Sequence, residues 1–306
     1  MKLREITSDL RFPEGPVALP DGSFLVVEIA RGTLTRVEAD GHKEVVADTG
    51  GGPNGAAIGP DGKCYLCNNG GFLWHEDEQG IRPVLQAPDY SGGRIERVDL
   101  ETGEVEVLYT HAGDTPLKGP NDIIFDTSGG FWFTDLGKVR ANEMDRGRVF
   151  YARADGSSCR EVIYPMVMPN GIGLSPDGTR LYVAETEACR LWDFEVTAPG
   201  EIRKEPWPSP SGGRLLAGPG GYQRFDSLAV DGEGNICVAT LINGGITVVS
   251  PGGASVEHLP MPDMYTTNIC FGGPELCTAY MTLSMGGRLV SMEWPRPGLA
   301  LNYLND

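Results

Sequence analysis

A short pattern occurs six times in the chain, and its spacing restricts the fold more than any other feature of the sequence. In each unit a polar residue begins a short apolar run, a turn follows, and a second apolar run begins. These polar residues, called the head residues below, are Glu14, Asn54, Asn121, Asn170, Asp226 and Asn268. In the first five units the head lies seven positions before the residue that precedes the turn glycine, whereas Gly273-Pro274 replaces this turn in the sixth. A fixed spacing of this kind indicates a repeat architecture.

Each unit also supplies further segments with strand character. Residues 32–37, 93–98, 147–151, 245–249 and 287–291 are rich in β-branched or aromatic residues and alternate in polarity, which is typical of strands. Four strands per unit and six units in 306 residues predict an all-β fold, a six-bladed β-propeller with four-stranded blades, in a single domain over residues 1–306. The Gly-His and Trp-Asp marks of WD40 repeats are missing.

The ends of the chain and two long insertions complete this picture. Residues 2–6 are expected to pair as an outer strand with the last blade, near residues 287–294, and so to close the ring. Residues 69–93 and the Pro- and Gly-rich residues 197–223 are long enough to act as lids over a site or as surface decoration.

Charge and cysteine content exclude several classes of partner. A net charge of −17 argues against nucleic acid and anionic membrane surfaces and is compatible with cation binding. No apolar run approaches the roughly 20 residues of a membrane span, and the first ten residues lack the apolar core of a secretory signal. Seven scattered cysteines predict reduced thiols in a cytoplasmic protein. The protein is expected to be a monomer or a small homo-oligomer. The Cys64 and Cys67 pair is expected to pack in the core, because residues three apart on a strand point to opposite faces.

In a propeller the innermost strands begin at one mouth of the central channel, so the head residues are expected to meet there. Two carboxylates and several amide oxygens form a set of hard ligands that suits calcium, with magnesium or manganese next. The alternative for Asn54 and Asn268 is that asparagine before the turn shapes the backbone. Four basic residues could contact an anionic or polyhydroxy substrate, although solvated surface charge is the simpler explanation for each alone: Arg94, Lys118, Lys138 and Arg140.

Several of these segments resemble one known family. They are Phe12-Pro-Glu14-Gly-Pro, Gly119-Pro-Asn121-Asp122, residues 131–135, residues 169–178 and residues 225–232. In this order they are similar to the SMP-30/gluconolactonase/luciferin-regenerating-enzyme family, and the resemblance covers nearly the whole chain. It implies a six-bladed propeller with one divalent metal ion in the channel. It also implies that Glu14, Asn170 and Asp226 are the metal ligands, with Asn121 as a further ligand or as a substrate contact, a position where the diisopropylfluorophosphatase branch also has an asparagine.

One position departs from the family pattern. Animal members have an arginine two residues before the asparagine that matches Asn121, where it helps to hold the sugar, whereas this chain has Gly119. Substrate contacts are therefore expected from Lys118 or Arg94, and gluconolactone itself becomes a less secure substrate than lactones in general.

The activity that the resemblance implies is hydrolysis of a sugar-type lactone by a metal-dependent lactonase. The metal is expected to be calcium, with zinc, manganese or magnesium as alternatives, Asp226 is the candidate general base, and Asn121 orients the substrate. The alternatives are a phosphotriesterase-like or esterase activity at the same metal site, and a non-catalytic propeller that binds a ligand or a protein partner.

Overall fold

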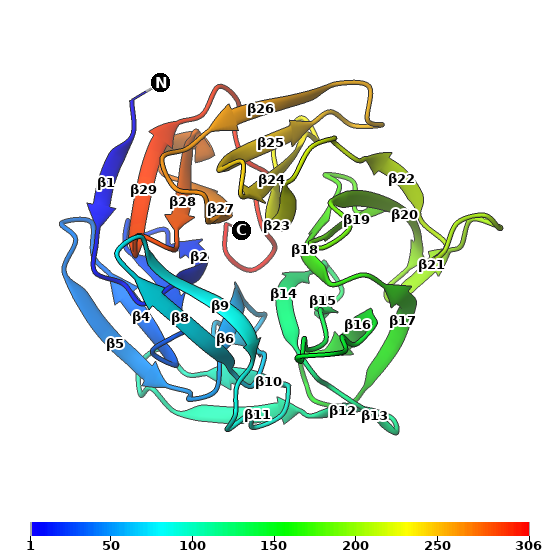
Figure 1. Cartoon of the computed structure of the whole chain (residues 1–306), viewed down its shortest axis with the longest axis horizontal. Helices are drawn as coiled ribbons and strands as arrows, with labels where there is room; N and C mark the ends of the chain where they lie inside the picture. The colour runs from blue at the N-terminus through cyan, green and yellow to red at the C-terminus, as the bar shows by residue number, and fades with distance from the viewer. Residues whose placement is uncertain (1, 306) are drawn as a thin grey trace.

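The computed structural model describes residues 2–305, and in it six small β-sheets stand in a ring around a central axis (Figure 1). The protein is a six-bladed β-propeller, as the repeat predicts. Within the described residues the only helical segment is one 3-10 turn, η1 (Pro274–Leu276). No helix within this range is both long and apolar enough to cross a membrane.

In each of the first three blades the strands follow one another from the channel outward. Blade 1 consists of β2 (Pro13–Ala18), β3 (Phe24–Glu28), β4 (Thr33–Val37) and β5 (Lys43–Asp48). Blade 2 consists of β6 (Pro53–Ile58), β7 (Cys64–Asn68), β10 (Arg94–Val98) and β11 (Val105–Tyr109). Blade 3 consists of β14 (Pro120–Phe125), β15 (Gly130–Asp135), β16 (Gly147–Arg153) and β17 (Cys159–Met166). Two short hairpins lie outside the blades: β8 (Phe72–Asp77) with β9 (Gly80–Gln86), and β12 (His111–Ala112) with β13 (Thr115–Pro116).

The other three blades follow the same order. Blade 4 consists of β18 (Pro169–Leu174), β19 (Arg180–Glu185), β20 (Arg190–Ala198), β21 (Glu201–Arg203) and β22 (Arg214–Ala217). Blade 5 consists of β23 (Arg224–Val230), β24 (Ile236–Leu241), β25 (Gly245–Val249) and β26 (Val256–Pro260). Blade 6 consists of β27 (Thr266–Gly272), β28 (Thr278–Leu283), β29 (Arg288–Glu293) and β1 (Arg4–Thr7).

The prediction of four strands per blade needs one correction, in blade 4. The long strand β20 has two outer partners, because β21 pairs with its second half and β22 pairs with its first half. Both partners come from the insertion at residues 197–223. Much of this insertion therefore extends the outer edge of a blade (Figure 1).

The hydrophobic core explains why the ring holds together. It consists of six clusters, each shared by two neighbouring blades, and the cluster of Phe24 and Leu289 joins blade 1 to blade 6. Inner strands are therefore buried on both faces, as in β24, where all six residues are buried, whereas the outermost β26 is largely exposed. Cys64 and Cys67 are buried free thiols in these clusters, as expected.

Strand β1 closes the ring, and this prediction is confirmed. Arg4 pairs with Ser291 and Thr7 pairs with Leu289, so the first strand of the chain lies beside the last (Figure 1). The other end of the chain runs across the channel. There the Leu299 amide donates to the Val230 carbonyl (3.1 Å), and the Asn302 side-chain amide donates to the Phe125 carbonyl (2.9 Å). The C-terminal segment, residues 295–305, thus borders the mouth of the channel that lies away from the head residues.

Candidate functional site

All six head residues lie on the innermost strands, at places where the pairing of these strands is irregular. In every blade the register between the first and second strands shifts at or beside the head residue. Such a bulge adds a residue to one strand and re-aims the side chains beside it. The innermost strands also contact each other around the full ring, in the order β2, β6, β14, β18, β23 and β27. The heads are therefore gathered around one end of the channel.

Small residues beside the heads allow this close approach. A side chain at Gly15 would collide with the carbonyl of Asn54 in the next blade, and Gly15 also has a positive φ of 48°. A side chain at Gly171 would collide with the backbone of Asp226. The backbones of neighbouring head residues therefore lie close together. A glycine follows several of the heads because a larger residue would not fit there.

Glu14 and Asn268 join blades 1 and 6 across the seam of the ring. The Asn268 side-chain amide donates to Glu14 Oε2 at 2.7 Å, and the backbone amide of Gly15 donates to the same oxygen at 2.7 Å. Burial raises the pKa of Glu14 to about 7, although these hydrogen bonds oppose the shift. Glu14 is only 2% exposed and both of its hydrogen-bond donors are neutral. Ionisation of its carboxyl group would therefore destabilise the folded protein.

Asp226 and Asn170 form the corresponding pair between blades 4 and 5. Asn170 lies close enough to the Asp226 carboxyl group to oppose the rise of its pKa. The Asn170 side-chain amide donates to Thr186 Oγ1 at 3.2 Å, and Asn170 Oδ1 accepts a bond from Ser227 Oγ at 3.3 Å. Burial, followed by repulsion from the charge of Glu14, raises the pKa of Asp226 well above its usual value. The repulsion agrees with the positions of Glu14 and Asp226 at the same end of the innermost strands β2 and β23.

Asp122 is a third buried carboxyl group of this cluster, and the sequence reasoning did not single it out. Its Oδ1 accepts the Ile123 amide at 2.9 Å and its Oδ2 accepts the Ile172 amide at 3.3 Å. Burial, followed by the charge of Glu14, raises the pKa of Asp122 to about 8. Strict alternation would place Asp122 on the face opposite to Asn121, but the register shift between Pro120 and Ile123 removes that alternation.

The buried side-chain oxygen of Asn121 indicates most directly that a binding partner belongs at this site. Asn121 is 3% exposed, and nothing within residues 2–305 hydrogen bonds to its side-chain oxygen Oδ1. Buried acceptors are almost always satisfied by protein, water or an ion. An unsatisfied amide oxygen beside three carboxyl groups fits a hard cation, whose preferred ligands are carboxylate and carbonyl oxygens. Within residues 2–305 no three His, Cys, Asp or Glu side chains are arranged so that they alone could hold a metal ion. A metal site here would therefore also need side-chain oxygens of asparagine.

The two predicted basic contacts lie at the same end of the molecule and already have protein partners. Arg94 donates from Nε to Glu96, from Nη1 to Ser91 and from Nη2 to the Thr49 carbonyl. Lys118 is 45% exposed and its ammonium pairs with Asp145. Their role in substrate binding therefore stays a prediction, and for Arg94 it would require some of these bonds to be exchanged.

The insertion at residues 69–93 packs against the rim of this mouth. The hairpin β8–β9 places Trp74 against Phe12, with ring centroids 5.1 Å apart, and Phe12 lies two residues before Glu14. The Ile81 amide on the same hairpin donates to the Met285 carbonyl of blade 6 at 3.3 Å. The hairpin thus connects its own blade to blades 1 and 6 beside the acid cluster.

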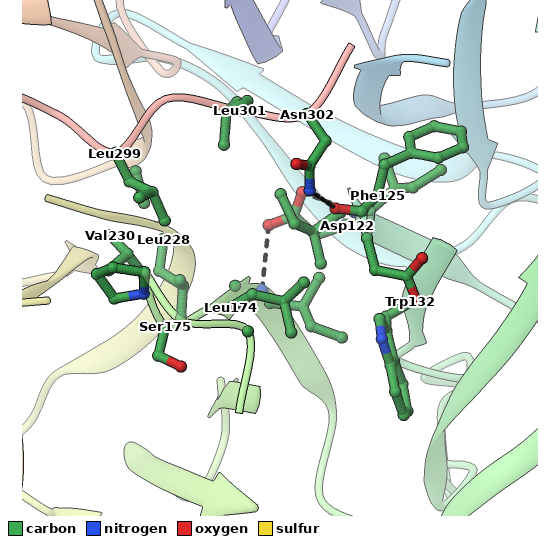
Figure 2. Close-up of a pocket in the computed structure, with 18 of the residues that line it drawn as sticks. Asp122, Phe125, Trp132, Leu174, Ser175, Leu228, Val230, Leu299, Leu301 and Asn302 are labelled. Atoms are coloured by element: carbon green, nitrogen blue, oxygen red, sulfur yellow. Dashed lines mark hydrogen bonds between the residues drawn. The ribbon is translucent and has the colours of Figure 1, made fainter. Parts of the chain in front are cut away.

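On the other side of the cluster the channel widens into a cavity of about 420 Å³. Figure 2 shows Asp122 among the residues that line it, together with Leu174, Leu228 and Leu299, and Asn302 of the C-terminal segment. The channel is therefore not filled by side chains, and Asp122 borders a space that is large enough for several water molecules or a small ligand. The metal ligands that the resemblance implies do not line this cavity.

Comparison with known proteins agrees with this fold. A gluconolactonase from Zymomonas mobilis is 26% identical over 300 residues, which cover 87% of this chain and 75% of the relative. Lactonase drp35 from Staphylococcus saprophyticus is 27% identical over 243 residues, which cover 79% and 67%. The structure of a gluconolactonase from Xanthomonas campestris has the same fold, with a TM-score of 0.74 at 21% identity over 96% of this chain and 89% of that one. The sequence pattern of the SMP-30/Gluconolactonase/LRE-like region matches residues 12–285. The chain therefore belongs to the SMP-30/gluconolactonase/LRE-like family, as the sequence resemblance indicated.

Proposed function

We propose that this protein is a divalent-metal-dependent lactonase that opens a sugar-type lactone to its hydroxy acid. The observation that carries the proposal is that Glu14, Asn121, Asn170 and Asp226 all lie at one end of the innermost strands, where Asn121 Oδ1 is buried and unsatisfied. The names of the similar gluconolactonase and lactonase support the choice of a lactone as the substrate.

In this proposal the oxygens of Glu14, Asn170 and Asp226 hold the cation, and Asn121 Oδ1 completes the set or faces the substrate. A bound divalent cation would supply Lewis-acid polarisation of the lactone carbonyl and a more acidic water. Calcium suits a site of carboxylate and amide oxygens best, and zinc, manganese and magnesium are the alternatives.

The protein side chains then have separate tasks. Asp226 is the proposed general base, because its carboxylate can accept the proton of the attacking water. Glu14 is held by Gly15 and Asn268, so its position is fixed before the substrate arrives. The Asn121 side-chain amide would orient the lactone. The water-excluding burial of these groups strengthens every electrostatic interaction among them.

The test is lactone hydrolysis in a pH-stat, corrected for the spontaneous reaction. Protein treated with EDTA is expected to lose activity on glucono-1,5-lactone and to regain it with calcium, manganese or zinc. Asp21→Asn, which changes a turn carboxylate of blade 1, is the matched control for Asp226→Asn. Hydrolysis that survives complete metal removal would contradict the proposal.

The same assay separates the alternatives. Faster hydrolysis of an organophosphate or an aryl ester than of any lactone would assign the site to the phosphotriesterase or esterase class, since a phosphoryl oxygen could use the same cation. Metal that raises the melting temperature while every ester and lactone stays intact would indicate a non-catalytic propeller.

A further inference from the structure

A buried lysine lies beside the head residues and has no part in the mechanism above. Lys138 is 1% exposed, and its ammonium donates to the Gly71 carbonyl at 2.8 Å and to Asn69 Oδ1 at 3.2 Å. It also lies 4.3 Å from the ring centroid of Phe72 and 5.1 Å from that of Tyr90. Burial lowers the pKa of Lys138 to about 7, although the charges of Asp135 and Asp145 oppose the shift. The two hydrogen bonds use two of the three ammonium N–H groups, so the third remains available to an anionic partner.

The asparagine that holds this lysine contains a second unsatisfied donor. Asn69 Oδ1 accepts the Gly71 amide at 2.9 Å as well as the Lys138 ammonium, and these two donors fix the orientation of the amide group. Its Nδ2 points away from them. Asn69 is fully buried, and nothing within residues 2–305 accepts a hydrogen bond from Nδ2. Unpaired buried donors of this kind normally have a partner in the functional state.

These donors lie at the same mouth as the proposed metal ligands. Lys138 follows strand β15 by three residues, and the end of that strand, Asp135, pairs with Pro120, the neighbour of Asn121. On the other blade, Asn69 touches Gly52, two residues before the head Asn54. The two donors therefore lie between blades 2 and 3, beside Asn121.

We propose that Lys138 and Asn69 form a subsite for a carboxylate carried by the substrate, so that the preferred lactone is derived from a sugar diacid. This inference rests on the proposed function and specifies its substrate class. The subsite offers only donors, one of them on a cationic group, and an acceptor-only oxyanion matches that set. A neutral hydroxyl would be a weaker acceptor and would bring a donor of its own, for which the subsite offers no acceptor. In a chain with a net charge of −17, a local cation is also what an anionic substrate requires.

The competing explanation is that Lys138 only holds the hairpin β8–β9 in place, through Gly71 and Phe72. The two explanations differ in what Lys138→Met should change. A purely structural lysine would alter the binding of all ligands by a similar factor, whereas a carboxylate subsite would alter only the binding of ligands that carry the additional carboxylate.

The experiment compares two sugar acids on the calcium-loaded protein by isothermal titration calorimetry. D-glucarate and D-gluconate share one carboxylate, and only D-glucarate has the second one. The wild type is expected to bind D-glucarate at least tenfold more tightly, the range of a charge-assisted hydrogen bond. Lys138→Met is expected to bring the two affinities within about twofold of each other. The matched control is Lys63→Met, which removes a partly exposed lysine paired with Asp99, and it should leave the ratio unchanged.

A second variant covers the case in which Lys138→Met fails to fold. Asn69→Asp keeps the oxygen that accepts from Gly71 and Lys138 but removes the Nδ2 donor, and it should also abolish the preference for D-glucarate. Equal affinity of the wild type for both acids, no binding of either acid, or a preference that survives both substitutions overturns the inference.

Hydrolysis of glucaro-1,4-lactone and glucono-1,4-lactone supplies the link to activity. If neither lactone is hydrolysed while the calorimetric preference holds and depends on Lys138, the proposed function fails and the carboxylate subsite stands. If both are hydrolysed without any preference in binding or in kcat/KM, the subsite fails and the lactonase stands.

Discussion

Replacing Glu14 by glutamine should stabilise the metal-free protein, and only at neutral or alkaline pH. Burial raises the pKa of Glu14 from 4.5 to about 7, so the folded protein binds more protons than the unfolded chain between these values. The free energy of unfolding of the metal-free wild type therefore falls as pH rises through this window and stays low above it. A shift of this size corresponds to about 3 kcal/mol, at about 1.4 kcal/mol per pKa unit.

Glutamine does not ionise, yet it keeps an oxygen that can accept from Gly15 and Asn268. Between pH 5 and pH 8, the difference in unfolding free energy between Glu14→Gln and wild type should move by about 2–3 kcal/mol in favour of the variant. The assay is urea unfolding in EDTA at both pH values, with the exposed Glu101→Gln as the control. In calcium the order should reverse, because the variant has lost a ligand charge. A difference that is the same at pH 5 and pH 8 would refute the reasoning.

Three further results are expected. Asp226→Asn should lower kcat for lactone hydrolysis by at least about 100-fold, the usual contribution of a general base, and full activity in a pH-stat would remove Asp226 from that role. Calcium affinity should fall by up to about tenfold per pH unit below pH 7, because the pKa of Glu14 is about 7 and calcium must displace its proton; calorimetry at pH 6 and 8 would show this, and equal affinities would contradict it. Deleting residues 1–8 removes the outer strand of blade 6 and should lower the melting temperature by about 10 °C in calorimetry, whereas an unchanged transition would mean that β1 does not hold the ring closed.

The sequence was sufficient to predict the propeller and the positions of the heads, because these depend on local hairpin geometry. The constant spacing between head and turn fixes where each innermost strand begins and ends. Both Glu14 and Asp226 consequently lie on first strands of their blades, where the repeat places them. The outer strand β1 could also be predicted, since a ring with a short first segment needs a partner for its last blade.

The parts that escaped prediction depend on contacts between distant residues. Asp122 joins the acid cluster because a bulge interrupts the alternation of β14, and bulges leave little trace in a single sequence. Arg94 lies at the predicted mouth of the channel. Its hydrogen bonds to Glu96 and Thr49 could not be predicted, because only the folded structure brings these groups together. Lys138 was among the possible substrate contacts, but its burial could not be predicted, because it depends on the packing of Phe72 from the hairpin β8–β9.

The pairing of β1 with β29 has a consequence for the nascent chain. The ribosome makes β1 long before its partner at residues 288–293, so the contact must wait until β29 has been synthesised. Until then blade 1 exposes the apolar face that later packs against blade 6, including Phe24. Such long-range closure slows folding and leaves apolar surface exposed to other chains. The interval before β29 is made is therefore the period in which this protein most needs protection from aggregation.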